Sequence, residues 1–453
     1  MAKKKQPRFY LLTLGCPKNQ VDSEGMSELL VGGGYRPTEN PAHAELLIVN
    51  TCGFLEAAKA ESVGALQELA AAKRPGQALV AAGCMVQRFG PDLAREVPGL
   101  DGLIGTRSWP DILPFLQKVR HSRRQEPVFH LPETGEVPVD SVASSRAVLG
   151  PRASAYLKIS DGCSAPCAFC TIPGIKGLGH SRPRKLIVRE VRALVGQGVK
   201  EIILIGQDTT AYGRDRGEQD GLPPLMEEML RAAPELHWLR LMYAYPGHVS
   251  QRLIDVMATH PQICHYLDLP LQHGHPDTLR RMRRPHTVEK LLNWIESFRG
   301  AMPDAALRTT FIVGYPGETE AEFQGLLDFM QTVQFDRVGI FTFSREPGTP
   351  AYDLPDQVPE GVKQERYERA MELQQTISLD KNQSQIGRRL EALVDGAGDG
   401  VSIARSYRDA PEIDGFVIVE QELPVGEMVP VLVTGAMPYD LLAIPANQPI
   451  MVA

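Results

Sequence analysis

Residues 161–170 read Asp-Gly-Cys-Ser-Ala-Pro-Cys-Ala-Phe-Cys and place Cys163, Cys167 and Cys170 on one short loop. An ordinary [4Fe–4S] cluster is held by four cysteines, so a loop with three leaves one iron open to a ligand from outside the protein. Zinc sites usually combine CxxC or Cys/His pairs into a closed tetrahedron, and no such partner follows here. A disulfide is disfavoured because the chain opens Met-Ala-Lys-Lys-Lys without an apolar signal region. The loop therefore predicts an iron–sulfur cluster with an open iron.

The overall composition limits the class of protein. The chain has 453 residues, of which 43% are hydrophobic and 23% are charged. This length is too great for one compact core, so about two to three domains are expected. Because no apolar run approaches the roughly 18 residues of a membrane span, we expect a cytoplasmic protein without a membrane partner.

Residues 1–126 alternate apolar strands with helical periodicity, which predicts a parallel α/β domain. In a parallel sheet, the carboxyl ends of neighbouring strands share one edge. Cys16, Cys52 and Cys84 each follow a predicted strand, so we expect them to converge on a second cluster. The alternative is three unrelated core cysteines, which would lie inside strands. The predicted strands are 9–14, 45–49, 78–82 and 102–104, and the predicted helices are 23–31 and 54–72.

Residues 127–148 are rich in Pro, Ser, Gly and Glu without periodicity, which predicts a linker. A second α/β domain is predicted over 149–380. Six strands with intervening helices indicate a partial (β/α)6 barrel, whose chemistry is expected just past the carboxyl ends of its strands. Those strands are predicted at 155–160, 201–205, 239–243, 266–271, 307–313 and 338–343.

Residues 381–453 form the last predicted domain. Short alternating strands and Asp-Gly turns predict a small antiparallel β-barrel. From residue 388 onward it holds four arginines against ten acidic residues, a net charge of −6. Nucleic-acid readers neutralise phosphates with Lys and Arg, so this charge favours a basic protein as partner. The alternative is that the acids only keep the barrel soluble.

Four other residues of metal-ligating types are expected to be structural. Cys264 lies at a strand entrance and is interpreted as a small buried thiol. His265, His273 and His275 have no acidic or cysteine partner at ligand spacing, and adjacent strand residues point to opposite faces. We therefore do not expect them to bind a metal.

The cluster loop, with Phe169 just before its last cysteine, resembles the radical S-adenosylmethionine (SAM) enzymes. With the second cysteine triad and the order of the domains, the chain resembles the methylthiotransferases over nearly its whole length. One departure lies at 172–182, where relatives usually have a more basic, serine-containing stretch, and this leaves the loop contacts open. The runs 14–24, 50–54, 206–210 and 266–273 resemble the RimO branch, which modifies a ribosomal protein, more than the MiaB branch, which acts on transfer RNA.

The resemblance implies a radical SAM core followed by a TRAM domain. It implies β-methylthiolation of an aspartate in small ribosomal subunit protein twelve, with an external electron donor, a sulfur donor and no direct nucleic-acid substrate. Its cofactors would be SAM and two [4Fe–4S] clusters, and no catalytic side chain is expected beyond the cluster ligands. The clusters would be held by Cys163, Cys167 and Cys170 and by Cys16, Cys52 and Cys84, and the SAM contacts would be Phe169, Gln207, Thr309 and Gly314.

Two rival functions remain open at this point. The first is a transfer RNA methylthiotransferase of the MiaB type, for which the arginines at 280, 281, 283 and 284 offer a basic patch. The second is a non-enzymatic iron–sulfur electron carrier, which would normally complete its four ligands and needs no barrel chamber.

Overall fold

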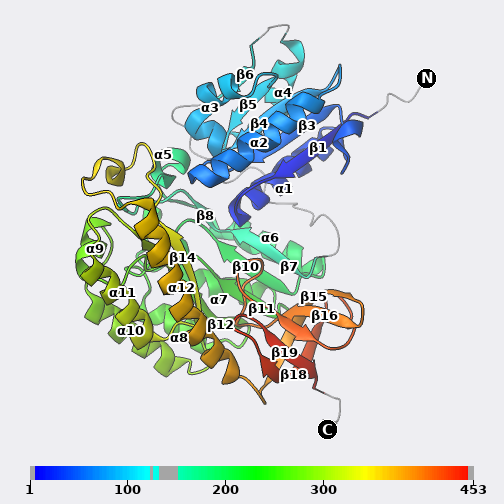
Figure 1. Cartoon of the computed structure of the whole chain (residues 1–453). Helices are drawn as coiled ribbons and strands as arrows, with labels where there is room; N and C mark the ends of the chain where they lie inside the picture. The colour runs from blue at the N-terminus through cyan, green and yellow to red at the C-terminus, as the bar shows by residue number, and fades with distance from the viewer. Residues whose placement is uncertain (1–5, 123–125, 132–151, 447–453) are drawn as a thin grey trace.

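The computed structural model of the chain describes residues 6–122, 126–131 and 152–446. It contains an N-terminal α/β domain, a central partial barrel and a small closed β-barrel, which confirms the predicted architecture (Figure 1). The central domain lies between the other two (Figure 1). In the described part of the chain, no helix is both long enough and apolar enough to cross a membrane.

The N-terminal domain is built on a parallel sheet with the order β2-β1-β3-β4-β5-β6. Strand β3 reads Leu-Leu-Ile-Val-Asn-Thr and is buried throughout, as a strand covered on both faces requires. Helices α1 and α4 pack on one face, where Met26 and Phe115 join one core, and α2 and α3 cover the other through Leu66 and Leu93. The elements are β1 (Arg8–Thr13), α1 (Pro17–Gly32), β2 (Arg36–Pro37), β3 (Leu46–Thr51), α2 (Glu56–Ala72), β4 (Ala78–Gly83), α3 (Cys84–Glu96), β5 (Gly102–Gly105), α4 (Ile112–His121) and β6 (Val128–His130).

Two boundaries of this domain differ from the prediction. Helix α1 begins at Pro17 rather than at residue 23, because proline suits the first helical turn and Cys16 stands at the N-cap. Strand β6 lies inside the predicted linker 127–148, so that assignment was wrong for Val128–His130, which pair with β5 at the sheet edge. A three-residue edge strand is too short to give a periodic pattern. Residues 132–148 of the predicted linker lie outside the described residues.

The central domain has six parallel strands in the order β14-β13-β12-β11-β10-β7, the consecutive arrangement expected for a partial barrel. Its largest core lies between these strands and the outer helices, and α12 runs beside β14 toward the small barrel (Figure 1). The elements are β7 (Ser154–Lys158), β8 (Ser160–Asp161), α5 (Ile172–Lys176), β9 (His180–Ser181), α6 (Arg184–Gly196), β10 (Glu201–Ile205), α7 (Leu222–Ala232), β11 (Trp238–Leu241), α8 (Gln251–Thr259), β12 (Ile263–Asp268), α9 (Pro276–Arg281), α10 (Val288–Ala301), β13 (Ala306–Val313), α11 (Glu320–Val333), β14 (Arg337–Thr342) and α12 (Glu360–Gln383).

Residues of the N-terminal and the C-terminal domain pack against the inside of the central barrel. Tyr156 and Tyr266 of the strands share one hydrophobic cluster with Val21 of α1 and with Leu393 and Ala410 of the small barrel. The N-terminal domain therefore covers one end of the barrel, and the C-terminal domain covers the other.

The C-terminal domain is a closed barrel with the order β15-β16-β17-β19-β18. It is antiparallel except where β17 pairs with β19, which is parallel and was not expected. Strand β18 pairs with β15 on one side and with β19 on the other. The last strand, β19, therefore closes the barrel between β18 and β17, and it runs parallel to β17. The elements are β15 (Arg389–Gly398), β16 (Val401–Arg405), β17 (Val417–Val419), β18 (Met428–Ala436) and β19 (Leu441–Pro445).

Buried ion pairs attach the small barrel to the amino-terminal ends of the central strands. Glu201, at the start of β10, accepts hydrogen bonds from Arg240 at 2.7 Å and from Arg405 at 2.8 Å. Burial alone would raise the pKa of Glu201, but the two guanidinium groups hold it at about 2. Arg408 pairs with Asp336 at 2.6 Å in the same junction. The small barrel is thus docked at the end of the barrel opposite to the cysteine loop.

Candidate active site

The N-terminal cysteine triad lies at one edge of the sheet, as predicted. Cys16 follows β1 at the N-cap of α1, Cys52 follows β3, and Cys84 is the first residue of α3 after β4. The three strands are neighbours, so their loops meet. Their approach is close: a Cβ atom added at Gly15 would lie 3.0 Å from the sulfur of Cys52.

Asn19 links the three loops through one buried side chain. Its Nδ2 donates to the carbonyl oxygens of Leu14 at 2.9 Å and Thr51 at 3.1 Å, and its Oδ1 lies 3.6 Å from the sulfur of Cys84. Sequence reasoning missed this residue, although an asparagine three positions after Cys16 was visible in the run Cys-Pro-Lys-Asn.

The central triad lies on the loop between β8 and α5. The amide of Ala165 donates to the sulfur of Cys163 at 3.4 Å, and the amide of Cys170 donates to the carbonyl of Cys167 at 3.2 Å. Gly162 starts the loop with φ of +73°, and a Cβ there would lie 2.2 Å from the carbonyl oxygen of Leu178. The turn therefore needs glycine at this position.

Arg284 is a second residue of the site, although the sequence analysis placed it in a possible RNA-binding patch. It is only 7% exposed, and its Nη1 lies 3.5 Å from the sulfur of Cys167. Its guanidinium group also stacks 4.3 Å from the centre of the Tyr245 ring. The guanidinium group is therefore part of the wall beside the cluster loop.

The donor set fits iron–sulfur clusters better than single zinc ions. All six cysteines are free of disulfides. Among the described residues, the only three His, Cys, Asp or Glu ligands with atoms within 4.8 Å of one another are His275, Asp277 and Glu322, so neither cysteine triad is that compact. Three thiolates on one tetrahedral zinc would be about 3.8 Å apart. Burial raises the pKa of Cys84 and Cys170 to about 12, so binding of iron must displace their protons.

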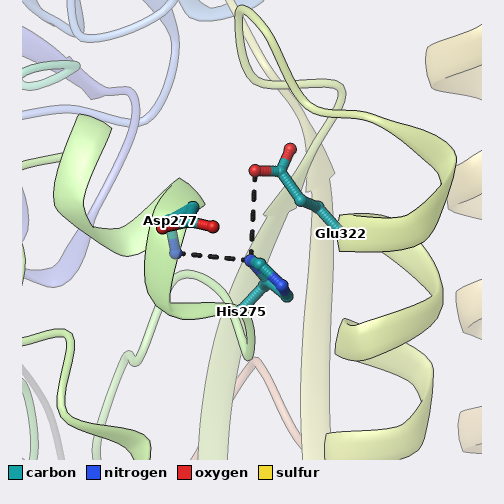
Figure 2. Close-up of side chains that lie close together, drawn as sticks. All are labelled: His275, Asp277 and Glu322. Carbon is teal, nitrogen blue, oxygen red and sulfur yellow. Dashed lines mark hydrogen bonds and ion pairs between the residues drawn. The ribbon is translucent and has the colours of Figure 1, made fainter.

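The group at His275 is explained by helix capping (Figure 2). Nδ1 of His275 accepts from the amide of Asp277 at 3.3 Å and lies 3.9 Å from Glu322, which the sequence argument did not anticipate as an acidic neighbour. Both oxygens of Glu322 accept from Arg281 at 2.9 Å, and one also accepts from the amide of Thr319. Nδ1 of His275 and both carboxylate oxygens of Glu322 are therefore already bonded to other groups of the protein.

The other three residues considered as alternative ligands also lie in protein contacts. Nδ1 of His265 is 2.8 Å from Asp304, and Nδ1 of His273 accepts from the amide of His275 at 2.9 Å. Cys264 is 2% exposed at the start of β12, the opposite end of the strand from the cluster loop.

A buried network of charges joins the two cysteine sites. Lys158 and Lys176 both pair with Asp22 of α1 and with Asp161 of the cluster loop. The distances are 3.1 Å for Lys176 to Asp22, 3.2 Å for Lys158 to Asp161 and 3.4 Å for Lys176 to Asp161. Although burial opposes charge, the two lysines hold the pKa of Asp161 far below its usual value. The junction between the domains is therefore charged and almost dry.

Lys18 lies in the same junction but has no acidic partner. It is 8% exposed, and its Nζ lies 2.9 Å from the centre of the Tyr243 ring. Within the described part of the chain, no carboxylate lies within 4.0 Å of this ammonium group. Burial lowers its pKa to about 8, against the opposing influence of Cys16 and the nearby acids.

The structure divides the four expected SAM contacts into two groups. Gln207 lies beside the cluster loop, where its Nε2 donates to Asp161 at 3.0 Å and its buried Oε1 has no partner among the described residues. Phe169 is part of the cluster loop itself, and its ring packs against a small core that includes Phe343.

Thr309 was expected at a strand end but lies inside β13, and Gly314 directly follows that strand; both serve the fold. The hydroxyl of Thr309 is fully buried, donates to Leu269 at 2.8 Å and accepts from Leu271 at 3.1 Å. The amide of Gly314 donates to the carboxylate of Glu318 at 3.0 Å. These two groups are therefore occupied by protein partners.

Three family profiles match the chain in the order of its domains. Residues 8–105 match Uncharacterized protein family UPF0004, residues 157–330 match the Radical SAM superfamily, and residues 386–445 match the TRAM domain. Among solved structures, the radical S-adenosylmethionine methyltransferase TsrM from Kitasatospora setae is similar in fold, with a TM-score of 0.55 and 14% identity over 88% of this chain and 80% of that chain.

Curated relatives match at much higher identity and over almost the full length. The ribosomal protein uS12 methylthiotransferase RimO of Chloroflexus aurantiacus is 50% identical over 96% of this chain and 98% of its own. The protein of the same name from Roseiflexus sp. is 48% identical over 96% of each chain, and that from Desulforamulus reducens is 44% identical over 96% and 99%. As a radical SAM protein, the chain uses SAM and a [4Fe–4S] cluster. The fold, the two cysteine sites and these relatives together establish that the chain belongs to the RimO family of methylthiotransferases.

Proposed function

We propose that this protein attaches a methylthio group to the β-carbon of an aspartate in ribosomal protein uS12. The observation that carries the proposal is the pairing of two cysteine triads across one buried junction, in a chain whose relatives bear that activity in their names. A radical enzyme that also transfers sulfur needs both a site that generates the radical and a site that holds the sulfur. The junction offers the two sites in neighbouring domains, joined by buried ion pairs.

The proposal assigns each triad a role. Cys163, Cys167 and Cys170 hold the cluster that, when bound, donates the electron for cleavage of SAM and so supplies a radical able to remove hydrogen from carbon. Cys16, Cys52 and Cys84 hold a second [4Fe–4S] cluster that carries the sulfur, and a second SAM supplies the methyl group. Electrons and sulfur come from external donors. Gln207 and the backbone of Phe169 are the proposed SAM contacts, while the other two expected contacts, Thr309 inside β13 and Gly314 just after it, have protein partners.

The protein's own groups hold the two sites in place. Lys176 lies close enough to Cys84 for their charges to interact, and it also binds Asp161, which directly precedes the cluster loop. The charged network therefore fixes the position of one triad relative to the other. Arg284 contacts the sulfur of Cys167 at 3.5 Å.

The surface of the small barrel suits a basic protein substrate. Arg405 and Arg408 are buried in the junction with the central domain, and so is Asp409, so the exposed charged residues in the described part of the barrel are two arginines and seven acids. This acidic excess favours recruitment of a ribosomal protein, in the cytoplasm where ribosomes are found, over binding of bare phosphate. The exposed acids are Glu391, Asp395, Asp399, Glu412, Glu420, Glu422 and Glu427.

The arginine run at 280–284 gives little support to a transfer RNA substrate. Arg281 is held by Glu322, Arg280 pairs with Asp277, and Arg284 is buried at the cluster loop. Only Arg283 of the four is exposed without such a pair among the described residues. Three of the four arginines of the predicted basic patch therefore make contacts within the protein.

The test uses the reconstituted enzyme with SAM and a reductant, without oxygen. Ribosomes, isolated uS12 and transfer RNA are offered in parallel, and each is analysed by mass spectrometry for an added methylthio group. We expect the group on an aspartate of uS12, free or in ribosomes. Modification of transfer RNA alone would overturn the assignment, and an enzyme that binds iron but never cleaves SAM would favour an electron carrier.

A further inference from the structure

Lys18 is a buried cation without a matching anion. More than nine-tenths of the residue is shielded from solvent, and its ammonium group lies 2.9 Å from the centre of the Tyr243 ring. Burying an ammonium ion is costly unless a counter-ion accompanies it. A ring face compensates only part of that cost. Because no described carboxylate lies within 4.0 Å of the ammonium group, the position suits a carboxylate brought by the substrate.

The acids around Lys18 are already engaged by other cations. Asp161 binds Lys158 and Lys176. Asp268 accepts from Arg308 at 2.8 Å and from the amide of Tyr243 at 3.0 Å. Because neither carboxylate reaches Lys18, the missing counter-ion must come from outside these residues.

The backbone places Lys18 and Tyr243 at the junction between the domains that carry the two cysteine sites. Lys18 stands in the first turn of α1, two residues after Cys16. Tyr243 lies two residues after Leu241, the last residue of β11, and it has φ of +61°, a conformation that residues other than glycine rarely adopt. This strained turn keeps the ring beneath the ammonium group.

We propose that Lys18 binds the side-chain carboxylate of the substrate aspartate and so holds its β-carbon between the two cysteine sites. This inference rests on the proposed function, because it takes the substrate to be an aspartate. The carboxylate carbon is bonded directly to the β-carbon, so anchoring the first fixes the second within one bond length. An asparagine amide would leave the buried ammonium without its anion, which makes Lys18 the residue that selects aspartate.

The experiment compares two peptides from the modified loop of uS12, one with the aspartate and one with asparagine in its place. Wild type, Lys18→Met and Lys18→Arg are reconstituted, and iron and sulfide are measured to establish that both clusters are present. We expect wild type to favour the aspartate peptide. Lys18→Met should lose about 10²-fold in kcat/KM on that peptide and lose most of the preference over asparagine. Lys18→Arg keeps the charge and should retain the preference.

The matched control is Lys59→Met, which removes a lysine of α2 that is 27% exposed and pairs with Glu56, and both peptides should react as with wild type. A Lys18→Met enzyme that keeps both clusters and the wild-type preference overturns the inference. If that variant fails to assemble, the decision falls to Lys18→Arg, whose loss of preference with intact clusters also counts against it. If wild type modifies neither peptide nor ribosomes, the proposed function fails instead.

Discussion

Asn19 shows how much of the N-terminal site depends on one amide side chain. It donates to two strand-end carbonyls and lies against the sulfur of Cys84. It is 1% exposed, so water does not replace these contacts when they are lost. Through these three contacts the Asn19 side chain reaches the loops that carry Cys16, Cys52 and Cys84. The geometry of the sulfur-carrying site is therefore sensitive to this position.

Replacing Asn19 with alanine should leave two buried carbonyls without donors. We expect a loss of about 1–3 kcal/mol in the free energy of unfolding. The reconstituted variant should also bind less iron, because the N-terminal loops separate while the central loop is unchanged. Urea unfolding and iron analysis measure the two effects. Asn40→Ala, at an exposed cap, is the control, and an Asn19→Ala protein with full iron and wild-type stability would contradict the prediction.

Two cysteine substitutions separate the proposed clusters. Cys16→Ala should remove the N-terminal cluster and spare the central one, and Cys163→Ala should do the reverse, because the two sites lie in different domains. Each variant should hold about half of the wild-type iron and sulfide. Only the first should still cleave SAM. If either change removes all the iron, the sites do not assemble independently.

The sequence predicted where the ligands lie better than it predicted what the neighbouring side chains do. Cys16, Cys52 and Cys84 follow neighbouring parallel strands, and the parallel arrangement alone brings such positions together. Thr309 was expected at a strand end, but it lies inside β13 and its hydroxyl bonds within the protein. The role of Lys18 depends on how two domains dock, which local periodicity does not encode.

At the scale of single elements, α1 joins the domains because it is buried on two faces. Lys18, Val21 and Asp22 recur at helical spacing and face the central barrel. Met26 and Leu30 instead pack against the domain's own sheet. Since one of these faces is polar, the helix has no simple amphipathic pattern. This explains why the sequence placed its start too late.

Asp22→Asn tests the link that α1 makes. The change leaves Lys158 and Lys176 buried with one carboxylate between them, and breaking such a pair costs about 3–5 kcal/mol. We expect a lower melting temperature and faster hydrogen exchange in both α1 and α5. Asp92→Asn, in an exposed pair on α3, is the matched control. Unchanged exchange in α5 would mean that the network does not hold the domains together.

At the scale of the whole molecule, both ends of the central barrel are closed by other domains. The small barrel is attached through ion pairs in which both partners are buried, notably Arg405 with Glu201 and Arg408 with Asp336. Removing the C-terminal domain would leave Glu201 and Asp336 without the arginines that pair with them. The C-terminal domain is therefore part of the core of this protein, in addition to any role in recognising the substrate. Its sequence predicted a barrel but gave no sign of this attachment.

The charge of Glu201 gives the attachment a defined pH dependence. Its pKa is about 2 in the folded protein and about 4.3 in an unfolded chain. A carboxyl group with a lowered pKa stabilises the fold above its unfolded pKa, and this stabilisation is lost as the pH falls toward 2. The loss amounts to about 3 kcal/mol. The protection factors of the amide hydrogens in β15 and β16 of the cluster-free protein, which correct for the intrinsic exchange rate at each pH, should therefore fall between pH 5 and 2. Glu201→Gln should have lower protection at pH 5 and depend less on pH, and a variant with the same pH dependence as wild type would show that other carboxylates control the docking.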